Sequence, residues 1–180
     1  MKILVTGSSG FVGKNLCAVT RRRDDVELFE YDVDSKPEEL DRALEQADFI
    51  VHLAGVNRPK NPDEFITGNA GSIEDICGKL TELGRTPKIM LSSSIQAELD
   101  NPYGASKRQA EEILERFSEN TGAECVVFRF KNLFGKWCRP NYNSVTATFC
   151  HNIANDLPIK ISDPSNEVDL THIDEVVEAL

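Results

Sequence analysis

The chain has 180 residues, of which 28% are charged and 40% fall in the hydrophobic class, as in a globular domain with a full core. Its net charge of -10 argues against nonspecific binding to nucleic acid or to an anionic membrane surface. No apolar run approaches the roughly 20 residues that span a bilayer, so we expect no membrane insertion. The five cysteines are widely spaced without a CxxC pair and the three histidines are scattered, which predicts reduced cytoplasmic thiols and no metal site.

Apolar segments of strand length alternate with segments of helical periodicity along the chain. This alternation predicts an α/β protein with a doubly wound parallel sheet, covered by helices on both faces. No obvious strand follows Asp32 before Pro37, so the sheet is expected to lack one edge strand or to keep a vestige of it, and Ser35 is a candidate helix cap. In chain order we predict a strand over 1–6, a helix over 11–22, a strand over 26–31, a helix over 37–46, a strand over 48–53, a long helix over 62–83, a strand over 87–91, a helix over 102–121, a strand over 124–130, and helices over 143–155 and from 173 onwards.

A glycine-rich turn, TGSSGFVG at residues 6–13, joins the first predicted strand to the first predicted helix. Glycines suit a sharp turn, the approach of a pyrophosphate and close packing of helix on strand. The start of the helix offers free N–H groups and a partial positive charge to a phosphate. The spacing is GxxGxxG instead of GxGxxG, and an ordinary tight turn is the alternative, but its position favours a Rossmann-like dinucleotide site. The candidate cofactor-binding residues of this turn are Gly7, Gly10, Phe11, Val12 and Gly13.

Asp32 ends the second predicted strand, 19 residues after Gly13. A carboxylate at this position can accept hydrogen bonds from both ribose hydroxyls of NAD, and it would repel the 2′-phosphate of NADP. The alternative is a solvated turn aspartate in an acidic stretch that also includes Asp34. As a cofactor-binding residue, Asp32 therefore favours NAD.

The segment YGASK at 103–107 places Tyr103 and Lys107 four residues apart, on one face of the predicted helix. A lysine ammonium beside a phenol lowers the tyrosine pKa, so that Tyr103 could act as an acid or base near neutral pH. A lone YxxxK occurs in many helices by chance, and the glycine-rich turn gives this one its weight. The predicted inward stripe is Tyr103, Lys107, Ala110, Leu114 and Phe117, and the predicted solvated residues are Glu111, Glu112, Glu115 and Glu119.

Taken together, these segments resemble the extended short-chain dehydrogenase/reductase family over nearly the whole chain. Two longer segments, 92–107 and 132–150, are similar to the reductase domain of capsular polysaccharide enzymes of the CapF type. The resemblance implies a Rossmann-like NAD(P)-binding domain over residues 1–180 with a truncated C-terminal substrate-binding portion, in a fragment of a longer chain whose cupin domain is missing. It is carried by TGSSGFVG (6–13), DFIVHLAG (48–55), Asn69, the serines at 92–94, YGASK (103–107), RFKNLFG (129–135) and THIDEVVEA (171–179).

The resemblance implies reduction of a 4-keto UDP-2-acetamido-2,6-dideoxy hexose on the N-acetyl-L-fucosamine route to a surface polysaccharide. Tyr103 would give its proton to the carbonyl oxygen as hydride arrives at C4, while Lys107 would hold the nicotinamide ribose. One serine would bond the reacting oxygen. The family pattern favours Ser94, then Ser93, with Ser92 near the cofactor, but Ser94 lies only nine positions before Tyr103, a shorter loop than is common. NADP follows from the resemblance and NAD from Asp32, so the cofactor is NADP or NAD.

Further residues have both a functional and a structural interpretation. Asn69 either orients the active-site helix or a relay water, or bonds neighbouring backbone. Leu53, Ala54 and Gly55 end a strand where a dinucleotide or a close-packed helix would lie. Arg129 is expected to be a structural ion-pair partner, the histidines structural, and the cysteines small buried hydrophobes. The resemblance and the cationic, aromatic character of the loop 135–144 give Lys131, Asn132, Leu133, Lys136, Trp137, Arg139 and Asn143 as candidate substrate contacts, with Asn57 and Arg58 as further ones.

Other functions are compatible with the same pattern, and the resemblance also implies an assembly. A nucleotide-sugar 4-epimerase or 4,6-dehydratase would share the scaffold, although Ile95 and Gln96 follow Ser94 where a dehydratase normally has an acid. A noncatalytic dinucleotide sensor would commonly lose the tyrosine or the lysine, and both are present. The resemblance also implies a homodimer that pairs the helices over 62–83 and 102–121 from two subunits.

Overall fold

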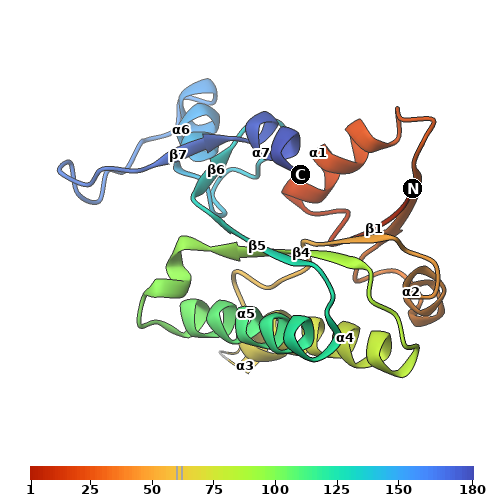
Figure 1. Cartoon of the computed structure of the whole chain (residues 1–180). Coiled ribbons are helices and arrows are strands. Elements are labelled where there is room, and N and C mark those ends of the chain that lie inside the picture. The colour runs from red at the N-terminus through yellow and green to blue at the C-terminus, as the bar shows by residue number, and fades with distance from the viewer. Residues whose placement is uncertain (60, 62) are drawn as a thin grey trace.

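A five-stranded parallel sheet runs through the centre of the protein, with helices on both faces (Figure 1). The computed structural model describes residues 1–59, 61 and 63–180. The strand order β2-β1-β3-β4-β5 confirms the predicted doubly wound α/β class. The strands are β1 (Lys2–Thr6), β2 (Glu27–Tyr31), β3 (Phe49–His52), β4 (Lys88–Ser94) and β5 (Cys125–Phe130).

The winding of the sheet reverses at β1. From β1 the chain moves outward to β2, which is the edge strand, and then crosses back to β3 on the other side of β1. Residues 32–36, all of them described, form no strand, which agrees with the prediction that the sheet lacks one edge strand beyond β2. The carboxyl ends of β1 and β3 therefore flank the topological switch point, which is where α/β sheets bind ligands.

Each face of the sheet buries its own apolar cluster. Successive strand residues point to opposite faces, so Leu4 packs on one side and Val5 on the other. Helices α2 (Pro37–Leu44), α4 (Ser72–Glu82) and α5 (Pro102–Thr121) cover the first face, where Ile50, Ile89 and Leu91 also lie. Helices α1 (Phe11–Thr20) and α7 (Ile173–Ala179) cover the second, and Figure 1 shows α1 and α7 across the sheet from α4 and α5.

The long helix predicted over 62–83 differs from the observed one in its first half. Its start at Pro62 lies outside the described residues; α3 (Asp63–Phe65) leads into a π-helical turn, η1 (Ile66–Gly71), and then into α4. The helical period over 62–83 predicts one stripe of Phe65, Asn69, Ile73, Ile76, Leu80 and Leu83, of which Asn69, Ile73, Ile76 and Leu80 are buried and Phe65 is half-buried. Leu83 is 44% exposed because α4 ends at Glu82, so its place in the stripe was wrong.

Two local features around the sheet differ from the predictions. Lys36, and not Ser35, is the N-cap of α2: its N–H donates to the Glu39 carboxylate at 3.2 Å, while the Ser35 hydroxyl accepts from the Asp32 N–H at 3.0 Å. Strand β4 runs on through the three serines to Ser94 and passes directly into a 3₁₀ turn, η2 (Ile95–Glu98). The serines are therefore held in the sheet.

Helix α5 begins and ends at the predicted residues. The Asn101 side chain caps it by accepting the Gly104 N–H at 2.8 Å. Gly122 ends it with φ +74°, the left-handed conformation that favours glycine. The predicted inward stripe is confirmed: Lys107, Ala110, Leu114 and Phe117 are buried and Tyr103 is half-buried.

A small second sheet was not predicted. Strands β6 (Asn132–Phe134) and β7 (Leu170–His172) pair in parallel and enclose α6 (Val145–Ala154) between them in sequence. The cysteines are all free, and the prediction that they are buried is wrong for Cys150, which is exposed on α6. Across the part of the chain that the structure describes, no helix combines the length and apolarity needed to cross a membrane.

Candidate active site

The glycine-rich turn packs backbone against backbone at the switch point. Gly7 has φ +69°, and a Cβ on it would lie 2.7 Å from the Ala54 nitrogen at the end of β3. A Cβ on Gly13 would lie 2.2 Å from the Gly7 carbonyl oxygen, so α1 sits directly on the turn. The Gly10 N–H donates to the same oxygen at 3.0 Å. Only hydrogen at positions 7 and 13 allows β1, the turn and α1 to meet this closely.

Asp32 lies against this turn. Its carboxylate accepts the Ser9 N–H at 2.7 Å and the Val33 N–H at 2.8 Å, and the residue is half-buried. Phe11 and Val12 open α1, whose first turn carries no acidic residue. The N-terminus of α1, the three glycines and one fixed carboxylate are thus gathered at one edge of the sheet, which suits the phosphates and ribose of a dinucleotide.

The chain that follows β3 packs closely against a lysine of α5. Leu53, Ala54 and Gly55 follow the strand, and the Ala54 N–H donates to the Thr6 hydroxyl at 3.3 Å. A Cβ on Gly55 would lie 2.6 Å from the Asn69 amide oxygen and 3.1 Å from the Lys107 ammonium. The structure therefore brings the residues after β3 next to α5 and η1.

Tyr103 and Lys107 share one face of α5, as predicted. Lys107 is 6% exposed, its Nζ donates to the Ser92 carbonyl at 3.1 Å, and it lies 5.9 Å from the centroid of the Tyr103 ring. The Tyr103 ring also packs on Phe65, with centroids 5.7 Å apart. Burial lowers the pKa of Lys107 to about 8, against the opposing effect of the Glu111 charge.

The expected lowering of the Tyr103 pKa is not what the structure gives. Burial raises the pKa of Tyr103, and a side-chain hydrogen bond with Ser94 opposes this. The reason is that the phenol is largely withdrawn from water, while the lysine ammonium donates to a carbonyl of β4 and not to the phenol. Tyr103 is thus a neutral acid in this state, which is the form that donates a proton.

The three serines of β4 face different partners. Ser94 is the one beside the Tyr103 side chain, and its hydroxyl also accepts the Gln96 N–H at 3.2 Å. Ser93 points to the opposite face of the strand, is buried, and donates to the Glu111 carboxylate. Ser92 contributes its carbonyl to Lys107. The structure therefore separates Ser93 from the reacting group, because strand residues alternate in direction.

Asn69 uses its amide inside the protein. It accepts the Val56 N–H at 3.0 Å and donates to the Val56 carbonyl at 3.1 Å and to the Ser106 hydroxyl at 3.0 Å. Ser106 in turn donates to the Tyr103 carbonyl at 2.7 Å. These bonds include neighbouring backbone, as the structural interpretation expects, and they also tie the loop after β3 to the helix of Tyr103.

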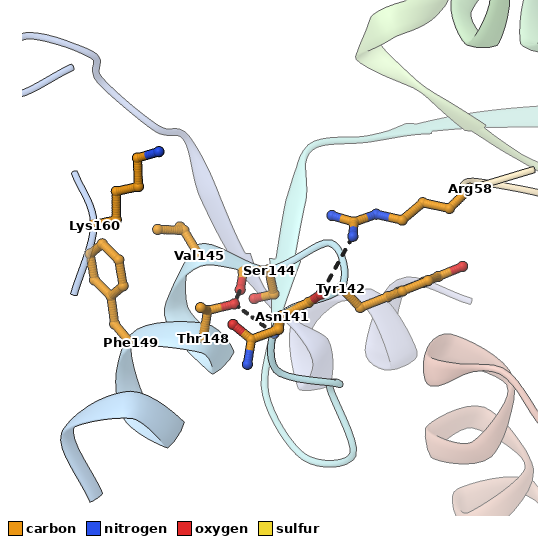
Figure 2. Close-up of a pocket in the computed structure, with 8 residues that line it drawn as sticks. All are labelled: Arg58, Asn141, Tyr142, Ser144, Val145, Thr148, Phe149 and Lys160. Atoms are coloured by element: carbon orange, nitrogen blue, oxygen red, sulfur yellow. Dashed lines mark hydrogen bonds between the residues drawn. The ribbon is translucent and has the colours of Figure 1, made fainter. Parts of the chain in front are cut away.

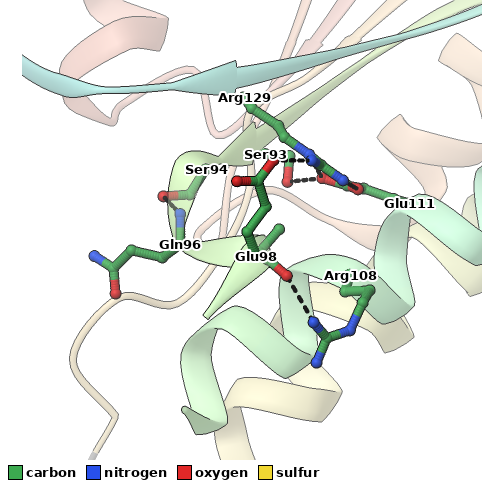
Figure 3. Close-up of polar contacts among 8 residues, drawn as sticks. Ser93, Ser94, Gln96, Glu98, Arg108, Glu111 and Arg129 are labelled. Atoms are coloured by element: carbon green, nitrogen blue, oxygen red, sulfur yellow. Dashed lines mark hydrogen bonds and ion pairs between the residues drawn. The ribbon is translucent and has the colours of Figure 1, made fainter. Parts of the chain in front are cut away.

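Two groups of residues near the site were missed or undervalued by sequence reasoning. Glu111, expected in solvent, contacts Ser93 and Arg129 (Figure 3), and its position four residues after Lys107 is the signal that could have found it. Arg129 pairs with Glu111 and Glu98, which confirms its predicted ion-pair role. His52 bonds the Thr6 hydroxyl at 2.8 Å and the Ser72 hydroxyl at 3.2 Å, and burial lowers its pKa to about 3.

The candidate substrate residues divide between two places. The Arg58 guanidinium donates to the Asn143 side chain at 2.9 Å and lies 5.1 Å from the Tyr142 ring centroid, which joins the loop after β3 to the loop before α6. Arg58 and Tyr142 border a hollow of ≈ 340 Å³ that Lys160 also lines (Figure 2). Neither Tyr103 nor Lys107 lines it.

The remaining candidates lie around β6. Asn132 donates to the Asp169 carbonyl at 3.3 Å and Lys131 pairs with the Asp169 carboxylate at 2.7 Å, so both are engaged with the residue before β7. Lys136 stacks over the Trp137 ring at 4.2 Å, its carbonyl accepts the Asn15 amide at 2.9 Å, and Trp137 is 46% exposed. Arg139 is exposed in the same loop.

A family model describes almost the whole chain: the model of the NAD dependent epimerase/dehydratase family matches residues 3–180. The chain belongs to this family. Within the family, it is 49% identical over 177 residues to the UDP-2-acetamido-2,6-beta-L-arabino-hexul-4-ose reductase of Pseudomonas aeruginosa, covering 98% of this chain and 48% of that protein.

Solved structures of family members superpose well on the chain. The capsular polysaccharide assembling protein CapF from Staphylococcus aureus matches with a TM-score of 0.87 and 47% identity, over 99% of this chain and 47% of that one. The UDP-glucuronic acid 4-epimerase from Bacillus cereus, solved with NAD, gives 0.86 at 19% identity over 98% and 72% of the chains, which shows a shared fold. The chain spans about half the length of the reductase and of CapF.

Proposed function

We propose that the protein is an NAD(P)H-dependent reductase of a 4-keto UDP-2-acetamido-2,6-dideoxy hexose, acting in the synthesis of a capsular or surface polysaccharide precursor on the N-acetyl-L-fucosamine route. The observation that carries the proposal is the convergence of Ser94, Tyr103 and Lys107 at the end of β4, with Gly55 packed against Lys107. The 49% identity to a UDP-sugar 4-keto reductase supports the substrate class.

The residues at the switch point fit a dinucleotide. Gly7 and Gly13 let the turn pack closely against α1 and the end of β3, and Gly55 lets the loop after β3 pack against Asn69 and Lys107. Gly7, Gly10, Phe11, Val12 and Gly13 would hold the pyrophosphate, and Lys107 the nicotinamide ribose. Asp32 would face the adenosine ribose and favours NAD, while the relationship to CapF-type reductases favours NADP. A reduced nicotinamide cofactor supplies the hydride.

The chain's own residues would then handle the proton and the charge. The Tyr103 hydroxyl, neutral because burial raises its pKa, donates its proton to the C4 carbonyl oxygen. Ser94 fixes that hydroxyl and the reacting oxygen by hydrogen bonds. The Lys107 ammonium would stabilise the negative charge of the phenolate that remains. Because the neutral phenol carries no such charge, this interaction is stronger after proton transfer than before it. The Arg58, Asn143 and Trp137 loops would contact the UDP-sugar.

The test is Tyr103→Phe in the full-length protein, followed by nicotinamide absorbance with the 4-keto sugar. We expect turnover to fall on the order of a hundredfold or more, because the proton donor is lost, while cofactor affinity stays within about twofold. Tyr31→Phe is the matched control, since Tyr31 ends the edge strand β2 and is separated from β4 by β1 and β3.

The rival functions all predict no net consumption of reduced cofactor in this assay, unlike the proposed reductase. Full activity in Tyr103→Phe would refute the proposed mechanism. A nucleotide-sugar 4-epimerase would convert its substrate without net consumption of reduced cofactor, and a dehydratase would likewise consume none. A dinucleotide sensor would bind cofactor and reduce no sugar in the full-length protein.

We further propose that residues 1–180 form the NAD(P)-binding domain with the start of the substrate-binding region, in a cytoplasmic homodimer that pairs α4 and α5 across subunits. The support for the dimer is the family resemblance: extended family members often pair the corresponding two helices of each subunit into a four-helix bundle. Light scattering of the full-length protein after gel filtration measures the subunit number, and a monomer at micromolar concentration would refute the dimer.

A further inference from the structure

Three ionisable side chains follow one another on a single face of α5. Tyr103, Lys107 and Glu111 are four residues apart, so each lies about one helical turn beyond the one before it. The first two belong to the candidate active site, and Glu111 has been given no role there. Its side chain is 13% exposed, whereas its neighbours Glu112 and Glu115 are exposed to solvent.

The Glu111 carboxylate joins the elements that build the site (Figure 3). It accepts the Ser93 hydroxyl from β4, and it accepts Arg129 from β5 in a two-pronged pair, with Nε at 3.0 Å and Nη2 at 2.6 Å. Arg129 also donates to the Glu98 carboxylate of η2 at 2.8 Å. Charge-assisted, bidentate bonds of this kind are both strong and directional. The serine end of β4 and the turn that follows it are thereby fixed against α5.

Glu111 is also the negative charge that faces Lys107. The described titratable groups around Lys107 are Tyr103 and Glu111 on α5 and His52 on β3, with the Ser92 carbonyl on β4. Burial lowers the pKa of His52 and raises that of Tyr103, so both are neutral at pH 7. Burial also opposes ionisation of Glu111, but hydrogen bonds from Arg129 and Ser93 keep its pKa below the ordinary value. A carboxylate held in the charged form lies beside a buried ammonium.

We propose that Glu111 is a positioning residue of the active site, which keeps Lys107 in its ammonium form and holds the serine end of β4 against α5 without touching substrate or cofactor. The inference rests on the proposed reductase function for its catalytic consequence. Its electrostatic part concerns Lys107 itself and is independent of the reaction.

The first experiment follows the protonation of Lys107 directly. The full-length protein is labelled with ¹³C-lysine, and the Cε signal of Lys107, identified by its absence in Lys107→Met, is followed by NMR as pH is raised. In Glu111→Gln we expect the midpoint to move to lower pH, because the charged form loses its partner. Glu112→Gln, an exposed neighbour on the same helix, is the control and should leave the midpoint in place. An unchanged Lys107 midpoint in Glu111→Gln overturns the proposal.

The second experiment separates positioning from a purely structural ion pair. The rate constant kcat/KM of Glu111→Gln is measured from pH 6.5 to 9. We expect a loss on the order of tenfold at pH 9 that shrinks towards pH 6.5, where Lys107 is protonated in both proteins. Glu111→Asp, which keeps the charge, should recover most of the activity at pH 9. An equal loss at every pH, with no recovery in Glu111→Asp, would mean that the pair is only structural.

A further variant covers the case in which Glu111→Gln fails to fold. The double substitution Glu111→Gln with Arg129→Gln removes both members of the ion pair and leaves only the exposed Glu98 carboxylate without its arginine. Its Lys107 midpoint should move in the same direction as in the single variant, and an unchanged midpoint again overturns the proposal. If the wild-type protein shows no reductase activity, the proposed function fails while the Lys107 titration still decides the role of Glu111.

Discussion

Gly13 is a position where a single added carbon would run into backbone. A methyl group there would lie 2.2 Å from the Gly7 carbonyl oxygen, which is backbone and cannot rotate away. We expect Gly13→Ala to destabilise the protein by about 1–3 kcal/mol and to weaken cofactor binding, because α1 must shift off the turn. Denaturant unfolding and a fluorescence titration with reduced cofactor measure the two effects.

The matched control for this change is Gly78→Ala on α4. A Cβ at Gly78 meets nothing within 4 Å, so the substitution should stabilise the protein by about 0.5–1 kcal/mol through the better helix propensity of alanine. If Gly13→Ala were as stable as the wild type and bound cofactor normally, the close packing of α1 on the turn would be wrong.

Asp32 offers a test of cofactor choice. Its carboxylate is fixed by the Ser9 N–H at the edge of the glycine-rich turn. We expect Asp32→Asn to shift the ratio of NADP to NAD affinity towards NADP by roughly tenfold, since the repulsion of a 2′-phosphate disappears. Asp34→Asn, an exposed residue of the same acidic stretch, is the control. An unchanged ratio would show that Asp32 does not discriminate between the two cofactors and is a solvated turn aspartate instead.

At this scale the sequence identified which residues converge but not how each one ionises. The spacing of Tyr103 and Lys107 was sufficient to place them on one buried face, because helix periodicity is local. The direction of the Tyr103 pKa and the engagement of Glu111 depend on burial and on β4 and β5, which are distant in sequence. Tertiary contacts decide these properties, so spacing alone could not.

Among the elements, the π-helical turn η1 carries a buried amide side chain, Asn69. Asn69 lies in it and satisfies the Val56 backbone and the Ser106 hydroxyl. π-Turns are uncommon and often occur at functional sites. We expect Asn69→Ala to lower the free energy of unfolding by about 1–3 kcal/mol, because buried polar groups lose their partner.

Urea unfolding measures this effect, and activity should fall with it, since Ser106 and Tyr103 share the hydrogen-bonded chain. Asn120→Ala, at an exposed position near the end of α5, is the control and should change the unfolding free energy by less than about 0.5 kcal/mol. Equal stability of the two variants would contradict the role of Asn69 in holding η1.

The elements that sequence reasoning placed correctly are those whose signal is local. The strands of the large sheet and α5 have clear periodicity and strong end signals, such as Asn101 and Gly122. The π-turn was missed because its contacts, such as those of Asn69 with Val56 and Ser106, join residues that are distant in sequence. Strands β6 and β7 were missed because each has three residues, too few for a period of two to be recognised.

For the molecule as a whole, His52 makes stability depend on pH. Its ring is buried between the Thr6 and Ser72 hydroxyls, and its pKa falls from 6.5 to about 3 in the folded state. Between these two values the unfolded chain binds a proton that the folded chain does not. Stability therefore rises with pH across this window and is lost as pH falls below 6.5, by up to about 1.4 kcal/mol per pH unit.

Unfolding free energies measured from pH 7 down to pH 4.5 test this prediction. His52→Gln keeps one acceptor and one donor but cannot titrate, so its slope with pH should be shallower than that of the wild type. His151→Gln, at an exposed site on α6, should keep the wild-type slope. Parallel slopes for wild type and His52→Gln would show that His52 is not the group responsible.

The short ladder between β6 and β7 has a consequence for motion. It is three residues long, and each strand continues directly into the main body, β6 from β5 and β7 into α7. The pairing of β6 with β7 joins the two ends of the intervening stretch, residues 135–169. Breaking a few ladder bonds would release this stretch and its Arg58 contact as one cooperative unit, leaving the five-stranded sheet closed. Amide exchange should therefore be faster across this stretch than in the five-stranded sheet, and correlated among its residues.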